Sequence, residues 1–149
     1  MEKSVYIIKP EGLAYRESIR QMLQTAGLTI EDSFTTTIPQ WVIAELYPNL
    51  FRKQGELWEI TLKYLLGEPC EVGIVCGVQA IARLFEACGT ETNPMRCAPD
   101  TIRRTFGKAT DESVRGMAFW LNVIHRPMDR QEARRDLRTV HMLRTSRPR

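Results

Sequence analysis

Four short segments with the composition of β-strands are spaced along the chain, and this spacing limits the folds open to it. The predicted strands, each rich in β-branched or aromatic residues, are residues 4–9, 28–38, 71–77 and 117–124. The predicted helices, which show helical spacing of apolar residues or begin at a proline, are residues 15–26, 39–46, 56–66 and 78–88. This order suits an antiparallel or mixed sheet. We predict an α+β fold in which helices cover a ferredoxin-like βαββαβ antiparallel sheet.

The C-terminal part of the chain combines a helix start with a strong positive charge. Asp129 can cap a helix, because Glu132 follows at the three-residue spacing of a capping box. Residues 126–149 hold eight arginines and three acids, but "RTSRPR" has no aromatic side chain to stack on a base, so nucleic-acid binding is not expected. A chain of 149 residues fits one domain. We place this domain at residues 1–138 and a basic, flexible C-terminal tail at residues 139–149.

The composition points away from membrane proteins and from disulfide-stabilised folds. No apolar run approaches the ~20 residues of a membrane span. The N-terminal "MEKSVYIIKPEG" meets proline and glutamate too early for a signal peptide, which predicts a cytoplasmic protein. The four cysteines, at positions 70, 76, 88 and 97, show neither CxxC spacing nor a histidine cluster. We therefore expect buried thiols and no metal ion held by the protein alone.

Single groups that can contact phosphate are scattered along the chain, although the common nucleotide-binding loops are missing. "FGKAT" (106–110) lacks the first glycine of a Walker loop, and neither GxGxxG nor GxSxG occurs. The scattered groups are Lys9, Thr92, Arg103 and Asn122, and His125 follows Asn122 by three residues. Taken alone, His125 is better explained as a core histidine, and a lysine at a strand end is usually only solvated.

Four motifs in order carry a family resemblance that spans roughly residues 3–137. They are "IIKPEG" (7–12), "ETNP" (91–94), "APDTIRRTF" (98–106) and "NVIH" (122–125). With these motifs the sequence resembles the nucleoside diphosphate kinases. The resemblance implies a phosphotransferase that moves the γ-phosphoryl group of a nucleoside triphosphate to a nucleoside diphosphate. The group would pass through a phosphohistidine at His125, with ping-pong kinetics.

The resemblance also implies the roles of the other site residues. The expected catalytic residues are His125, Lys9, Asn122 and Asp136, in which Asp136 holds the imidazole. The expected nucleotide-binding residues are Lys9, Tyr47, Trp58, Thr92, Arg103 and Asn122. The aromatic that stacks on the base would lie near Leu57 or Trp58, and the chemistry favours the indole of Trp58. Magnesium would be bound with the nucleotide, the partners would be ATP and nucleoside diphosphates, and the protein would be a homo-oligomer.

Several positions depart from the family pattern. "RPMD" (126–129) stands where the family has Gly-Ser-Asp-Ser or similar, and Asp136 replaces a glutamate. Glu86 falls near an expected arginine of the third long helix, where Arg83 is a candidate replacement. Residues 107–121 are longer than the family's segment, so Lys108 and Arg115 could add phosphate contacts, or the segment could cover the site or be plain surface.

Two alternatives follow from these departures. The long 107–121 segment would permit a phosphotransferase of the same type that acts on a specialised nucleotide or metabolite. The "RPMD" segment and Glu86 favour a nucleotide-binding module with little turnover. Retention of the phosphate-contacting residues together with His125 argues against a binding module, because binding alone needs no nucleophile.

Overall fold

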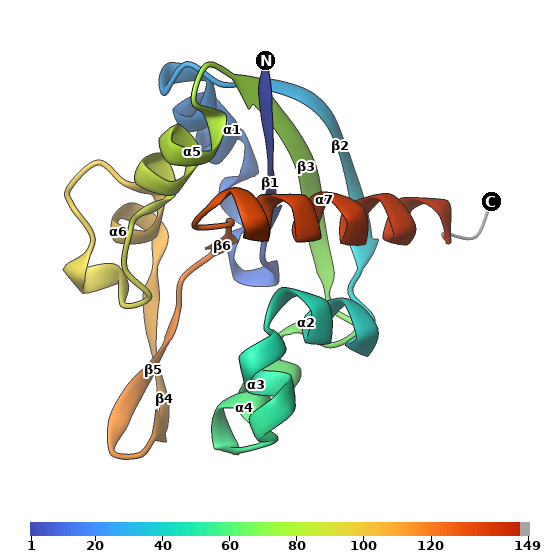
Figure 1. The fold of residues 1–149 in the computed structure, drawn as a ribbon. Helices are drawn as coiled ribbons and strands as arrows, with labels where there is room; N and C mark the ends of the chain where they lie inside the picture. The colour runs from blue at the N-terminus through green and yellow to red at the C-terminus, as the bar shows by residue number, and fades with distance from the viewer. Residues whose placement is uncertain (147–149) are drawn as a thin grey trace.

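A four-stranded antiparallel sheet forms the centre of the computed structural model, which describes residues 1–146 (Figure 1). The strand order is β2-β3-β1-β6, and the strands are β1 (Glu2–Ile8), β2 (Thr29–Thr37), β3 (Pro69–Gly77) and β6 (Ile124–His125). Every neighbouring pair is antiparallel. The predicted α+β fold, an antiparallel sheet covered by helices, is confirmed.

Helices cover both faces of this sheet. They are α1 (Arg16–Thr25), α2 (Gln40–Leu46), α3 (Pro48–Lys53), α4 (Glu56–Leu65), α5 (Ala80–Cys88), α6 (Ile102–Phe106) and α7 (Arg130–Thr145), with short 3-10 turns at Pro10–Tyr15 and Pro94–Arg96. In Figure 1, α7 runs across one face, while α1 and α5 lie together beyond the other. Among residues 1–146, no helix is long and apolar enough to cross a membrane.

The central strand β1 supplies side chains to two separate hydrophobic cores. Val5 and Ile7 pack with residues of α2, α4 and α7, whereas Tyr6 and Ile8 pack with residues of α1 and α5. Successive side chains of a strand point to opposite faces, so a strand with helices on both faces must be apolar throughout. This requirement explains the unbroken run "VYII", which ends just before Lys9.

The predicted last strand, residues 117–124, is wrong as one element. Its first part is β5 (Met117–Leu121), which pairs with β4 (Lys108–Val114) in a separate hairpin, and its end belongs to β6 beside β1. The break falls at Asn122 and Val123, because Val123 has a left-handed φ of 64° that no strand can contain.

The β4–β5 hairpin, which fills the long segment before β6, contacts α4 through side chains. Glu112 accepts hydrogen bonds from Lys63 Nζ at 2.7 Å and from the Tyr64 hydroxyl at 2.5 Å. The Tyr64 and Phe119 rings stack with their centroids 5.6 Å apart. The extra residues of this chain are therefore an ordered hairpin attached to a helix.

The C-terminal helix begins where the capping box predicts and ends later than expected. The Asp129 side chain accepts from the Glu132 N–H at 2.8 Å, which confirms the predicted cap. However, α7 continues to Thr145, and Val140 and Leu143 are buried in the core. The proposed tail boundary at residue 138 is therefore too early, and residues 147–149 of that tail lie outside the described residues.

Candidate active site

His125 is a buried histidine with one ring nitrogen held by a carboxylate. Its Nε2 lies 2.8 Å from Oδ2 of Asp136, which is fully buried on α7. The second carboxylate oxygen, Oδ1, accepts from Arg135 Nε at 3.1 Å. The other ring nitrogen, Nδ1, has no hydrogen-bond partner among residues 1–146, and the side chain is 9 % exposed. A carboxylate at Nε2 fixes the tautomer that keeps the proton there and leaves the Nδ1 lone pair free.

The surroundings of His125 keep its imidazole neutral. Burial is the main cause that lowers the pKa of His125 below its ordinary 6.5, and the charges of Lys9 and Arg103 lower it further. The Asp136 carboxylate acts in the opposite direction but does not reverse the shift. A neutral imidazole is the form that can act as a nucleophile at neutral pH.

A lysine, an amide and a tyrosine gather beside the histidine. Lys9 Nζ donates to Asn122 Oδ1 at 2.7 Å, and Asn122 Nδ2 donates to the Thr92 carbonyl at 3.3 Å. The Tyr47 ring meets the His125 ring edge-on at 5.4 Å, and Lys9 Nζ lies 5.7 Å from the Tyr47 ring centroid. The structure thus brings together residues from four distant parts of the sequence. The pairing of Ile7 with His125 in the sheet explains the closeness of Lys9.

Val123 connects this group of residues in a strained conformation. Its N–H donates to Glu11 Oε2 at 3.1 Å, and its carbonyl accepts from the Lys9 N–H at 2.8 Å. A Cβ added at Gly12 would lie 2.8 Å from the Val123 carbonyl oxygen, so only glycine allows this approach. Glu11 and Gly12 are therefore site-shaping residues, and the motif "IIKPEG" is the sequence signal that could have identified them.

Arg103 is buried against the backbone of β6, the strand that carries His125. Its Nη2 donates to the Ile124 carbonyl at 2.9 Å, and its Nη1 donates to the Glu91 carbonyl at 2.8 Å. Thr101 caps the short helix α6 that carries it, which fixes the direction of the arginine. Burial lowers the pKa of Arg103, because a charge without water around it is less stable.

Trp58 does not fit the predicted role of stacking on a base. Its side chain is 2 % exposed and belongs to the core under α2 and α7, where it meets the edge of the Phe51 ring at 5.5 Å. The neighbouring Leu57 is 39 % exposed and Phe51 is 43 % exposed, so these two present apolar surface to solvent in this part of the chain.

The other cations considered as possible phosphate contacts lie in other parts of the structure. The Arg83 guanidinium lies against Gly27, after the end of α1, so it does not replace the arginine expected near Glu86. Lys108 Nζ lies over the Tyr15 ring at 5.7 Å, and Arg115 is in the turn of the β4–β5 hairpin.

Sequence reasoning missed Arg126, which follows His125. It is 8 % exposed, its Nη2 donates to the Gly89 carbonyl at 2.9 Å, and its guanidinium lies 4.5 Å from the Phe85 ring centroid. The available signal was an arginine at a position where the resembled family has glycine.

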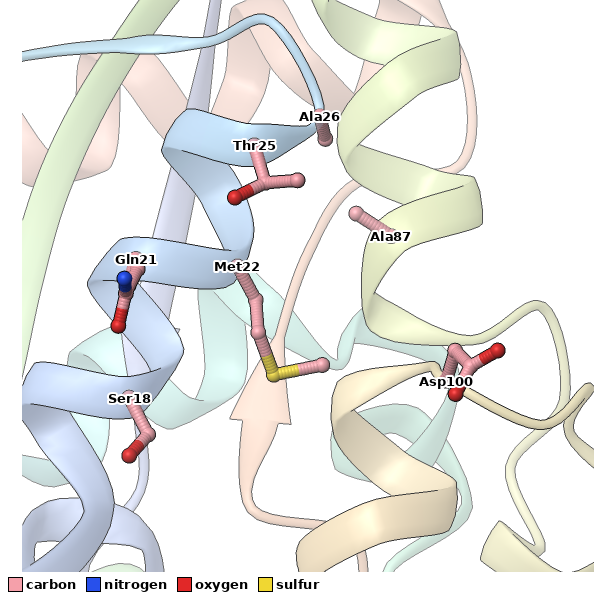
Figure 2. A pocket seen from close by; sticks show the side chains of 7 residues that line it. All are labelled: Ser18, Gln21, Met22, Thr25, Ala26, Ala87 and Asp100. Carbon is pink, nitrogen blue, oxygen red and sulfur yellow. The ribbon is translucent and has the colours of Figure 1, made fainter.

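A separate surface pocket between α1 and α5 contains none of these residues (Figure 2). Met22 points into it from α1, with Ala87 opposite on α5 and Asp100 at its edge. Its lining residues include no lysine, arginine, histidine or cysteine. The chemistry of the chain is therefore concentrated around His125.

Comparisons with known proteins agree with this geometry. The family model described as "Nucleoside diphosphate kinase" matches residues 2–143. A nucleoside diphosphate kinase from Streptococcus uberis is 29 % identical over 139 residues, which cover 92 % of each chain. The structure resembles a Borrelia burgdorferi nucleoside diphosphate kinase with bound vanadate and ADP, with a TM-score of 0.76, 23 % identity, and coverage of 93 % of this chain and 85 % of that one. A Halobacterium salinarum nucleoside diphosphate kinase in complex with CDP gives a TM-score of 0.75 at 20 % identity, with 93 % of this chain and 86 % of that one covered.

These two likenesses concern the fold, whereas the family model covers nearly the whole sequence. The chain therefore belongs to the nucleoside diphosphate kinase family, and it is a phosphotransferase enzyme.

Proposed function

We propose that this enzyme transfers the γ-phosphoryl group of a nucleoside triphosphate to a nucleoside diphosphate through a phosphohistidine at residue 125. The observation that carries the proposal is the His125–Asp136 pair, in which Nε2 is held at 2.8 Å and Nδ1 is left free. The Nδ1 lone pair attacks the γ-phosphorus, the bond from that phosphorus to the bridging oxygen breaks, and the diphosphate leaves with the electron pair. In the second half, a terminal oxygen of an incoming diphosphate attacks the same phosphorus and restores His125.

Cations and hydrogen-bond donors around His125 suit the charge of the moving group. Phosphoryl transfer depends mainly on position and on neutralising the charge of the phosphate oxygens. We assign this role to Lys9, Arg103, Thr92 and Asn122, with Tyr47 beside the transferred group. The ADP and CDP bound to the Borrelia and Halobacterium proteins support nucleotides as the substrates here.

A divalent cation fits this site as a companion of the nucleotide. Among residues 1–146, no group of three or more acidic, histidine or cysteine side chains could hold a metal ion. The nucleotide phosphates would therefore supply most ligands of magnesium, which when bound neutralises part of their charge. Lys9 and Arg103 would bind the oxygens that the ion leaves free.

The hairpin β4–β5 is the observation that favours a second candidate, an acceptor other than an ordinary nucleoside diphosphate. Through Glu112 it is attached to α4, the helix that also carries the exposed Leu57, near which the base was expected. Comparing discharge of the phosphoenzyme by different acceptors decides between the two. We also keep a cytoplasmic location and a homo-oligomeric assembly as predictions.

Intact mass after mixing with ATP and magnesium tests the proposal directly. We expect one phosphoryl group per chain, stable in alkali and lost in acid, as a phosphoramidate requires. Adding GDP or CDP should remove it and produce the corresponding triphosphate. A chain that binds ATP but never gains the group would be a binding module, and the proposed function would be wrong.

The acid limb of the phosphorylation rate should lie below pH 6.5. Burial holds the pKa of His125 under that value, so the nucleophile stays neutral as the pH falls through 7. The free energy of unfolding should change with pH in the same direction. Below pH 6.5, His125 takes up a proton in the unfolded chain before it does so in the folded chain. Stability is therefore highest above pH 6.5 and falls as the pH drops toward the folded-state pKa. Single-turnover labelling and thermal unfolding at a series of pH values measure both. A rate that already declines above pH 6.5 would contradict the assigned environment.

A further inference from the structure

Two arginine side chains are buried next to one another without a carboxylate partner. Arg103 is 4 % exposed and Arg126 is 8 % exposed, and both donate only to backbone carbonyls. Across residues 1–146, no ion pair involves either guanidinium. Buried charges in folded proteins are normally paired, because removing a charge from water is costly. This pair of cations therefore lacks an anion.

The surroundings of Arg126 increase this imbalance. Burial, and after it the positive charge of Arg103, lowers the pKa of Arg126 to about 10. Its Nε is buried and has no hydrogen-bond partner among the described residues. The guanidinium of Arg126 makes one hydrogen bond, from Nη2 to the Gly89 carbonyl, and lies over the Phe85 ring. Its other N–H donors are therefore left unused.

Arg126 lies near a position where this chain lacks an arginine that the resembled family has. The resembled family carries an arginine near the end of the helix that is α5 here, whereas this chain has the exposed Glu86. Arg126 reaches that end from a different element, because its guanidinium lies over Phe85 and binds the carbonyl of Gly89. Arg83, the only arginine on α5 itself, points to Gly27 instead.

We propose that Arg126 binds a phosphate oxygen of the nucleotide together with Arg103, in place of the arginine that the family carries on this helix. The proposal rests on the proposed function and extends it to a residue outside the family's motifs. A planar guanidinium suits this role, since it presents several donors to one phosphate. The competing explanation is that Arg126 only caps α5, where a cation near the last carbonyls is favourable.

Binding of ADP with magnesium to wild type, Arg126→Gln and Arg83→Gln tests the proposal without turnover. Loss of a charged hydrogen bond should weaken ADP binding by roughly 10- to 100-fold in Arg126→Gln. CDP should lose affinity by a similar factor, because phosphate contacts ignore the base. Arg83→Gln removes the same charge from the exposed surface of α5, and this variant should bind as wild type does.

Thermal unfolding of the same three proteins separates binding from capping. If Arg126 binds phosphate, Arg126→Gln unfolds at nearly the wild-type temperature without ligand, and the rise caused by ADP is much smaller. If Arg126 is only a cap, the unliganded variant unfolds at a lower temperature while ADP affinity is unchanged, and the proposal is wrong. Arg126→Lys keeps the charge, so it should retain more affinity than Arg126→Gln if the first variant folds poorly. A wild type that binds no nucleotide at all would overturn the proposed function and this inference with it, whereas unchanged affinity in Arg126→Gln would overturn this inference alone.

Discussion

His125→Gln is expected to abolish labelling by ATP and magnesium, with a loss of at least ~10³-fold in the rate of phosphorylation. Glutamine keeps a polar side chain of similar length, but its amide nitrogen is not a nucleophile. The matched control is His141→Gln, since His141 is the only other histidine and is exposed on α7. Quantitative labelling under single-turnover conditions measures the effect.

Nucleotide affinity should survive in His125→Gln. Lys9 and Arg103 remain in place, and both supply charge that does not depend on the nucleophile. A variant that binds ADP normally but takes no label separates chemistry from binding. Equal labelling of His125→Gln and wild type would show that another residue carries the phosphoryl group.

Asp136→Asn is expected to slow phosphorylation of His125 by about 10–100-fold and to leave ADP affinity nearly unchanged. The carboxylate accepts the Nε2 proton at 2.8 Å, whereas an amide can turn its N–H₂ to that nitrogen and favour the unreactive tautomer. Asp129→Asn is the control, because it makes the same change on the same helix at a cap where asparagine is well tolerated.

Asp136→Glu supplies a second comparison. It restores the side chain that the family carries and keeps the charge, so it should retain far more activity than Asp136→Asn. A labelling rate in Asp136→Asn equal to that of wild type would show that the 2.8 Å contact does not control the tautomer. His125 would then be oriented by the packing of Tyr47 and the β6 backbone alone.

The sequence predicts the parts of this structure that depend on local patterns. Strand composition and helical spacing identify β1, β2, β3, α1, α4 and α5 within a few residues. The cap at Asp129 fixes where α7 begins, and the family resemblance implies that Asp136 on this helix holds His125. Asp136 lies only 11 residues after His125, so the local signal that starts α7 is enough to bring its carboxylate near the imidazole.

The failures involve choices that a local pattern cannot make. Leu57 and Trp58 are one residue apart, yet one is half exposed and the other is in the core, because the large apolar indole gains more from burial than from a site at the surface. The split of residues 117–124 depends on a valine in the left-handed region, where β-branched residues are rare. The contacts of Arg126 are with residues about 40 positions earlier, so no local sequence pattern predicts them.

The strained backbone of Val123 has a consequence for how this protein evolves. A valine held at a φ of 64° costs about 1–3 kcal/mol of folding stability, and its bonds to Lys9 and Glu11 keep it there. Glycine would remove that cost, but it would also loosen the chain two residues before the nucleophile. Selection for stability and selection for turnover therefore favour different residues at position 123. A search for heat-resistant variants that ignores activity would be drawn to the one substitution that frees the backbone of the active site.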